Sequence, residues 1–219
     1  MLRLWLAVCA LALMLSGCTD EESSADVACW SSDDVVARDA DDQPVQWDAP
    51  PNQVIDPDAT YEAVLQTSEG EITWELLTEA APVTVNNFVC LARAGYYDGT
   101  PFHRILDGFV IQGGDPTGTG TGGPGYRFED EPVQGEYEAG AVAMANSGPD
   151  TNGSQFFIVL DDLRQTLPKN YNLFARVSGG QDVVEAIAKT PTSPDARGEV
   201  SVPDQPVILE SVTISEVAE

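Results

Sequence analysis

Short strand-like segments dominate the chain from residue 60 onward, and they leave room for only two helices. Two runs, 61–67 and 71–77, flank a turn at 68–70 and predict a hairpin. Apolar residues recur at helical spacing only in 82–94 and 181–189. Further strands are expected at 102–106, 109–113, 141–146, 155–160, 172–177 and 206–215. This order has too few helices for a repeated βαβ arrangement, and it predicts a mainly β fold with a closed or strongly curved antiparallel sheet.

The first residues of the chain have the pattern expected of an export signal. Residues 1–3 start with a basic charge, residues 4–15 are almost all apolar, and the small residues Ser16 and Gly17 precede Cys18. Because a bilayer span needs about 20 apolar residues, residues 1–17 are predicted to be a signal peptide. Residues 15–18 (Leu-Ser-Gly-Cys) also resemble the lipobox of bacterial lipoproteins, which implies cleavage before Cys18 and a lipid on that cysteine. An ordinary cleaved signal is the alternative.

Residues 18–58 are predicted to be an acidic tether between the lipid and a folded domain at 59–219. Asp and Ser are frequent in the tether, and four prolines interrupt residues 44–57. Such a segment buries too little apolar surface to offset the entropy lost on ordering, so a semi-extended spacer is expected. Trp30 and Trp47 are the exceptions, and either one could dock back onto the domain.

The four cysteines separate into different expected roles. Cys9 leaves with the signal and Cys18 carries lipid, so Cys29 and Cys90 remain. In an exported protein these two meet oxidising conditions and could form a disulfide. Alternatively, Cys90 is a small buried residue of a helix, and spacing alone does not decide between the two. Neither lies in a C-x-x-C or His-rich context, so no metal site is expected.

The formal net charge of −26 restricts the partners of the chain. So acidic a protein is repelled by nucleic acid and by anionic lipid headgroups. We therefore expect no nucleic-acid partner, and we attribute the acidity to solubility. We also expect a monomer that needs no metal or cofactor.

Two segments about forty residues apart, 102–115 and 144–157, place aromatic rings beside hydrogen-bonding side chains. Arg104 is one of only ten basic residues in the chain, and it lies among apolar residues. Gln112 and Phe157 add an amide and a ring, without an evident nucleophile or carboxylate pair. An apolar bowl with hydrogen-bond donors at its rim suits a proline ring and the carbonyl group that precedes it.

These segments are similar to the signature stretches of the cyclophilins, which are peptidyl-prolyl cis-trans isomerases. The matching stretches are Phe102-His103-Arg104-Ile105, Gly108-Phe109-x-x-Gln112-Gly113-Gly114-Asp115 and Met144-Ala145-Asn146-x-Gly148-Pro149-x-Thr151-Asn152-Gly153-Ser154-Gln155-Phe156-Phe157. The resemblance covers roughly residues 60–217. It implies a closed eight-stranded antiparallel barrel capped by two α-helices.

The resemblance also implies the roles of individual residues. Arg104 matches the catalytic position of the family, and Phe102 is expected in the core. The positions that line the substrate groove are matched by His103, Phe109, Val110, Gln112, Ala145, Asn146, Gln155, Phe157, Leu167 and Tyr171. Thr166 stands where cyclosporin-sensitive members have tryptophan, so strong cyclosporin binding is not expected.

The implied activity is isomerisation of Xaa-Pro bonds in exported proteins, on the outer side of a bacterial membrane. Arg104 would stabilise the twisted prolyl amide without a covalent intermediate. The alternative is a binding module or holdase chaperone that recognises proline-containing segments without turnover. Arg104 favours the enzyme, because a pure binder has less need of a cation at the amide.

Two other patterns are interpreted as structural. His103 lacks a Ser or Cys partner and an orienting carboxylate at a recognisable spacing, so a hydrolase triad is not expected. Residues 118–123 satisfy G-x-G-x-x-G, but Pro124-Gly125 follows instead of a helix. A dinucleotide site needs that helix, so a surface loop is predicted.

Overall fold

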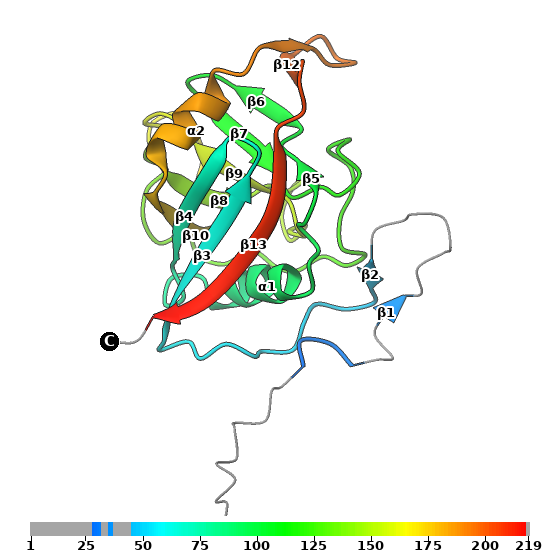
Figure 1. Cartoon of the computed structure of the whole chain (residues 1–219). Coiled ribbons are helices and arrows are strands. Elements are labelled where there is room, and N and C mark those ends of the chain that lie inside the picture. Colours follow the sequence, from blue (N-terminus) through cyan, green and yellow to red (C-terminus); the bar gives the residue numbers. More distant parts are fainter. Residues whose placement is uncertain (1–27, 32–34, 37–44, 218–219) are drawn as a thin grey trace, which may run out of the picture.

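The structure, a computed structural model, describes residues 28–31, 35–36 and 45–217. Figure 1 shows a curled sheet with two helices packed around it and an N-terminal segment along its lower side. No helix among these residues is long and apolar enough to cross a membrane. The predicted signal peptide, residues 1–17, and the predicted lipidation site, Cys18, lie outside the described residues.

The main sheet consists of nine antiparallel strands. In sheet order they are β5 (Thr100–Pro101), β13 (Ile208–Val217), β3 (Thr60–Thr67), β4 (Gly70–Leu76), β10 (Leu173–Gly179), β8 (Ala141–Met144), β9 (Phe156–Val159), β7 (Val110–Gly113) and β6 (Arg104–Leu106). The edge strands β5 and β6 are separated in the chain by only Phe102 and His103. Three Cα–Cα steps span at most about 11 Å, so the two edges of the sheet must approach each other. The sheet therefore curls into a barrel whose edges are joined by the chain itself (Figure 1).

Two helices and two short hairpins complete the described elements. They are α1 (Pro82–Arg93), α2 (Gln181–Ala188), β1 (Val35–Val36) with β2 (Gln46–Trp47), and β11 (Thr192–Pro194) with β12 (Val200–Pro203). The prediction of a mainly β antiparallel barrel with two helices is confirmed. The sheet has nine strands where eight were expected. The strand predicted at 102–106 begins only at Arg104, because the backbone N–H of Phe102 instead donates to the Val207 carbonyl at the other edge.

Alternating burial along β3 and β4 determines which face of this hairpin packs inward. The inward side chains are Tyr61, Ala63, Leu65, Ile72, Trp74 and Leu76. Trp74 is fully buried, and its ring meets Phe156 edge-on at a centroid distance of 5.1 Å. The hairpin turn needs Gly70, whose φ is +135° and whose added Cβ would lie 2.9 Å from Val183 Cγ2 of α2. Glycine thus allows α2 to pack against the turn.

The N-terminus of α1 is capped by a residue distant in sequence. Its N-cap residue is Ala81, whose side chain cannot accept a hydrogen bond. The Glu131 carboxylate accepts hydrogen bonds from the backbone N–H groups of Val83 (3.0 Å) and Thr84 (2.8 Å), and from the Thr84 hydroxyl (2.6 Å). A carboxylate here also complements the positive end of the helix dipole. Glu131 therefore fixes the start of α1 against the loop that precedes β8.

Replacing Glu131 with alanine is expected to lower the free energy of unfolding by about 1–2 kcal/mol, because two backbone donors and a hydroxyl lose their acceptor. Denaturant unfolding measures this change, and the exposed Glu69 in the β3–β4 turn provides a matched control as Glu69→Ala. Equal unfolding midpoints for the two variants would rule out the capping role.

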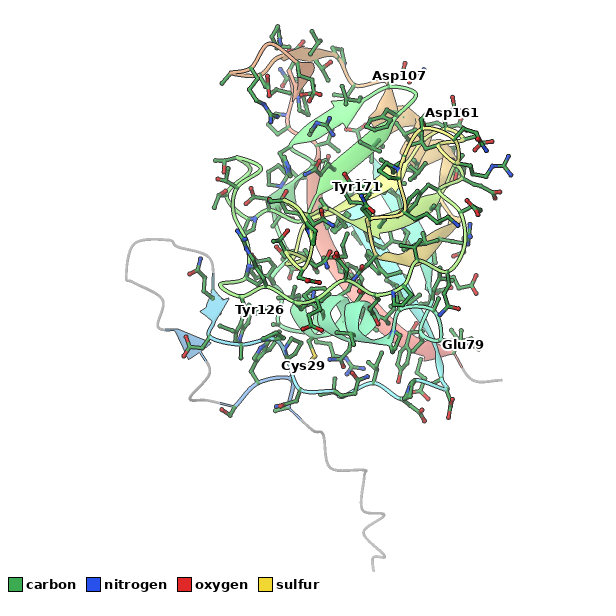
Figure 2. All side chains as sticks on the ribbon, turned by 180° about the vertical axis from the view of Figure 1, so that it is seen from behind. Cys29, Glu79, Asp107, Tyr126, Asp161 and Tyr171 are labelled. Carbon is green, nitrogen blue, oxygen red and sulfur yellow. A yellow bond between two sulfur atoms is a disulfide. The ribbon has the colours of Figure 1, made fainter. Side chains whose placement is uncertain are left out.

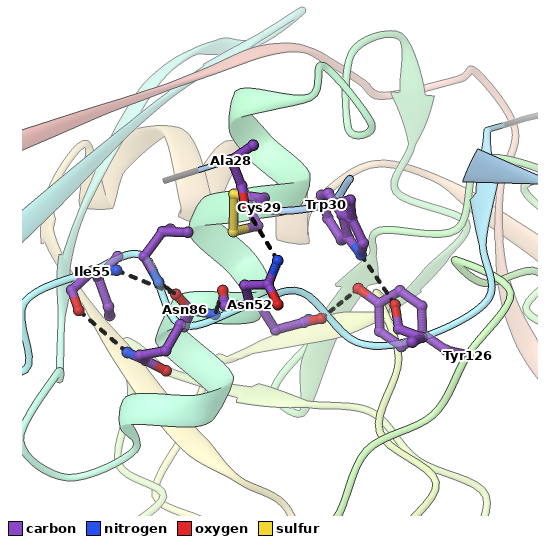
Figure 3. The surroundings of a disulfide bond; sticks show 12 residues. Ala28, Cys29, Trp30, Asn52, Ile55, Asn86 and Tyr126 are labelled. Atoms are coloured by element: carbon purple, nitrogen blue, oxygen red, sulfur yellow. Dashed lines mark hydrogen bonds between the residues drawn. A yellow bond between two sulfur atoms is a disulfide. The ribbon is translucent and has the colours of Figure 1, made fainter. Parts of the chain in front are cut away.

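Residues 28–31 and 45–58, which belong to the predicted tether, lie against the domain. Cys29 forms a disulfide with Cys90 of α1, which resolves the pairing that spacing left open (Figure 3). The ring of Trp30 stacks on that of Trp47 at 4.2 Å, and Trp47 is itself buried. Asn86 of α1 anchors the next stretch, because its side-chain oxygen accepts hydrogen bonds from the backbone N–H groups of Val54 and Ile55.

Both Trp30 and Trp47 therefore dock onto the domain, which is the possibility that the sequence left open for either one. The physical reason is that this stretch carries enough aromatic and aliphatic surface, together with a covalent link, to offset the cost of ordering. The described part of the predicted tether is therefore packed, where a spacer had been expected.

Candidate functional site

A cavity of about 150 Å³ opens between β6, β7, β9 and the loops that follow β8 and β9. Its lining residues are Arg104, Phe109, Val110, Gln112, Ala145, Asn146, Phe157, Leu167 and Tyr171. All nine were predicted as site residues from the sequence. Of that predicted set, only His103 and Gln155 do not line this cavity. Figure 2 views the molecule from behind and labels Tyr171 over the sheet.

Strand register explains why these residues meet. Arg104 on β6 pairs with Gln112 on β7, and Gln112 pairs in turn with Phe157 on β9. Directly paired residues of neighbouring antiparallel strands place their side chains on the same face. Arg104, Gln112 and Phe157 therefore form a row across three strands, with the cation at one end and the ring at the other.

The apolar side of the cavity belongs to a small hydrophobic cluster separate from the main core. Val110 and Phe157 are buried in this cluster, together with Leu163 and Leu173 of neighbouring segments. Tyr171 packs edge-on against Phe157 at a centroid distance of 5.4 Å. A cavity of about 150 Å³ has room for a ring about the size of benzene, which this apolar side of the cavity could contact.

Among the residues that the structure describes, Arg104 is the only charged one that lines the cavity, and it forms an ion pair. Its Nε lies 2.7 Å from Glu199 Oε2, and its Nη2 lies 2.9 Å from Glu199 Oε1. The side chains are 24% and 35% exposed. The hydrogen bond from Arg104 lowers the pKa of Glu199. Sequence reasoning missed Glu199, which lies 95 residues from Arg104 outside any matching motif.

Amide side chains form a connected rim beside the cavity. Gln112 Nε2 donates to Gln155 Oε1 at 2.9 Å, and Gln155 Nε2 donates to the Gly122 carbonyl at 2.9 Å. Gln155 therefore holds Gln112 in place while lying outside the cavity lining. Asn146 Nδ2 donates to the Asn170 carbonyl at 2.8 Å, which ties it to the loop that carries Tyr171.

A larger hollow of about 800 Å³ adjoins the cavity and shares Gln112, Ala145 and Asn146 with it. Gln155 and the glycine-rich loop around 120–125 form part of its wall. As predicted, this loop is not followed by a helix. It is held by Asp115, whose carboxylate accepts hydrogen bonds from the backbone N–H groups of Thr117 and Gly122. A side chain at Gly122 would collide with that carboxylate.

His103 is not among the residues that line the cavity. Its ring lies against Gly120, where an added Cβ would be 3.5 Å from Nε2. Among the described residues, neither ring nitrogen has a hydrogen-bond partner. Burial of the ring lowers the pKa of His103; Asp115 opposes this shift and Arg104 adds to it. The ring is therefore neutral at neutral pH and serves as packing beneath the loop.

His103 is the only histidine of the chain, so we expect its titration to give the free energy of unfolding a distinct pH dependence. Its pKa is lowered on folding, so the unfolded chain binds the proton more tightly, with a pKa near 6.5. The contribution to stability is complete above about pH 6.5 and decreases as the pH falls below that value. Unfolding measured between about pH 6.5 and 5.5 should show this slope in the wild type and a flatter curve in His103→Gln. If the slope of stability against pH in His103→Gln equals that of the wild type, groups other than His103 cause the pH dependence.

Groups of three or more His, Cys, Asp or Glu side chains that could hold a metal are absent from the described residues. In the described part of the chain, the residues that line the cavity include no Ser, Cys, Asp or Glu. What it offers chemically is one oriented cation, amide donors and an apolar recess. Such a site can bind an uncharged ring and stabilise developing electron density beside it.

Comparison with known proteins identifies the family. Residues 63–214 match the model of the cyclophilin type peptidyl-prolyl cis-trans isomerases. Peptidyl-prolyl cis-trans isomerase B of Streptomyces anulatus is 45% identical over 171 residues, which cover 69% of this chain and 95% of that protein. Peptidyl-prolyl cis-trans isomerase A of Mycobacterium tuberculosis is 45% identical over 178 residues, covering 73% and 94%.

Solved structures agree with this assignment. A cyclophilin type peptidyl-prolyl cis-trans isomerase of Cryptosporidium parvum superposes with a TM-score of 0.66 at 33% identity, covering 73% of this chain and 99% of that one. A structure of the same enzyme in the presence of the dipeptide Ala-Pro gives 0.65 at 34% identity, covering 70% and 98%. The chain belongs to the cyclophilin family, and it is a peptidyl-prolyl cis-trans isomerase.

Proposed function

We propose that Arg104 is the catalytic group of this isomerase and that the cavity beside it holds the proline ring. The observation that carries the proposal is the position of Arg104 as the one charged residue in an otherwise neutral lining. Support also comes from the Cryptosporidium parvum relative, whose structure was determined in the presence of Ala-Pro. The substrates would be proline-containing segments of unfolded polypeptides.

The proposed mechanism separates holding the ring from rotating the bond. Amide resonance opposes rotation with a barrier of about 18–20 kcal/mol. Val110, Phe157 and Leu167 would hold the ring, so that the residue on the other side of the bond turns. As the amide twists, its nitrogen becomes pyramidal and gains a lone pair. A guanidinium at that position stabilises the twisted state more than the planar one, which is the requirement for catalysis.

The amide rim would fix the peptide backbone during rotation. Gln112 is itself held by Gln155, and Asn146 is held by the Asn170 carbonyl. Donors that are already oriented need no reorganisation when the substrate binds. Two of the predicted residues thereby take distinct parts, with Gln112 facing the substrate and Gln155 supporting it.

The alternative is a binding module or holdase that captures proline segments without turnover. The apolar recess alone would serve such a protein. The oriented guanidinium distinguishes the two, because it adds little to binding of an uncharged planar amide and much to a twisted one.

The test is an isomerisation assay on the chain from residue 19 onward, which keeps every described contact. With a short Xaa-Pro peptide, the uncatalysed reaction takes about 10–100 s, and catalytic amounts of protein should shorten it many-fold. Peptide binding without acceleration would favour the binding module and reject the proposal.

We further propose that the protein is exported and lipid-anchored outside the bacterial cytoplasm. Residues 1–18 support this, since a signal-like run ends at a lipobox-like cysteine. The Cys29–Cys90 disulfide supports an oxidising compartment. The Cys18→Ala variant should leave the membrane fraction of cells and fail to incorporate labelled fatty acid; membrane association equal to that of the wild type would contradict the anchor.

A further inference from the structure

We infer that Glu199 is a positioning residue, which holds the Arg104 guanidinium in the orientation needed for isomerisation. The inference rests on the proposed role of Arg104 and adds a second residue to it. Glu199 belongs to the β11–β12 hairpin, a part of the chain that no site prediction covered. It acts through Arg104 and does not itself line the cavity.

Arg104 and Glu199 contact each other through two hydrogen bonds. Nε and Nη2 of Arg104 donate to the two oxygens of one carboxylate, at 2.7 and 2.9 Å. A bidentate pair of this kind fixes both the position and the plane of the guanidinium. Arginine has five N–H donors, so three remain for a bound peptide. Without the carboxylate, a partly exposed arginine would sample several rotamers.

Glu199 is itself held by the turn of its hairpin. Asp195 Oδ1 accepts a hydrogen bond from the backbone N–H of Glu199 at 2.9 Å, and the backbone N–H of Asp195 donates to the Glu199 carbonyl at 2.7 Å. Asp195 Oδ1 also accepts from the backbone N–H of Arg197 at 2.8 Å. The backbone of Glu199 is therefore tied at both its N–H and its carbonyl group, at one end of the hairpin. The backbone from which the Glu199 side chain extends toward Arg104 is therefore held in place.

The opposite role, in which Glu199 restrains the enzyme by occupying Arg104, fits the geometry less well. A blocking carboxylate would have to occupy the space of the substrate, but Glu199 is not among the cavity-lining residues, whereas Arg104 is. The carboxylate engages only two of the five donors.

The test compares Glu199→Ala and Glu199→Gln with a control, Asp204→Asn, which removes one negative charge from the base of the same hairpin. Glu199→Ala is expected to lower kcat about ten-fold with little change in KM, because ground-state binding of the ring is untouched. Glu199→Gln, which can accept only one of the two hydrogen bonds, should lie in between. Asp204→Asn should match the wild type.

A double variant separates positioning from general structural damage. In the Arg104→Ala background, Glu199→Ala should produce no further loss, because its partner is already absent. An equal loss in both backgrounds, or a wild-type or faster rate for Glu199→Ala, would overturn the inference. Full activity of Arg104→Ala alone would instead reject the proposed function, so the two failures are distinguishable.

Discussion

Replacing Arg104 with alanine is expected to lower kcat/KM for a proline peptide by about 100- to 1,000-fold, the usual effect of removing one electrostatic stabiliser of a transition state. The loss should appear in kcat, because the apolar cavity that would hold the proline ring remains. Affinity for the same peptide, measured by titration calorimetry, should change far less than the rate. The variant should fold normally, since Arg104 and its partner Glu199 are both partly exposed.

The matched control is Arg164→Ala. Arg164 is an exposed arginine that pairs with Asp162 and Glu138 and lies outside the cavity lining. Its removal should leave kcat/KM unchanged, which separates the local role of Arg104 from the loss of any one positive charge. A rate for Arg104→Ala equal to that of Arg164→Ala would refute the assignment of the catalytic group.

Replacing both Cys29 and Cys90 with serine is expected to lower the free energy of unfolding by about 2–4 kcal/mol. The bond closes a loop of 61 residues in sequence, so its loss gives the unfolded chain much more freedom. It also detaches the segment that carries Trp30 from α1. In the folded variant, the Trp30–Trp47 stack should loosen and change the tryptophan fluorescence.

Thermal or denaturant unfolding with and without reductant measures the disulfide contribution. Reductant should lower the midpoint of the wild type to that of the double-serine variant and should leave the variant itself unchanged. A wild-type midpoint that does not respond to reductant under conditions that open the bond would show that the disulfide contributes nothing to the stability of the domain. Isomerase activity should survive in the variant at temperatures where it is folded, because none of the cavity-lining residues belongs to this segment.

Local patterns in the sequence predicted the secondary structure well. The helix expected at 82–94 occupies Pro82–Arg93, and the one expected at 181–189 occupies Gln181–Ala188. The hairpin turn at 68–70 was marked by Gly70, which takes a conformation that other residues rarely adopt. These features depend on neighbours in the chain, so a single sequence contains their signals.

Features set by long-range contacts were harder to predict. The chain passes from β5 at one edge of the sheet to β6 at the other edge. At this point the backbone N–H of Phe102 donates a hydrogen bond to the carbonyl of Val207, more than a hundred residues away. The cap of α1 comes from Glu131, which lies 47 residues beyond Thr84 in the sequence. Neither partner carries a local signature, because the interaction exists only once the sheet has closed.

In the candidate site, too, residues in local motifs could be predicted, whereas residues placed by long-range contacts could not. Seven of the nine cavity residues could be predicted because they lie in motifs whose order and spacing are specific, whereas Leu167 and Tyr171 were assigned by their position in the family pattern. Gln155 and His103 were assigned to the lining by position, whereas the structure gives one a supporting hydrogen bond and the other a packing role beneath a loop. Glu199 could not be found, because nothing in its own segment points to a partner 95 residues away.

The central claim is that the cavity binds the proline segment and the guanidinium accelerates its isomerisation. NMR exchange spectroscopy of one Xaa-Pro peptide tests both parts at once, because binding shifts the peptide signals and turnover transfers magnetisation between its cis and trans forms. With catalytic amounts of wild-type protein we predict both effects, and with Arg104→Ala we predict shifted signals without exchange. Binding without exchange in the wild type, or equal exchange in both proteins, would contradict the account.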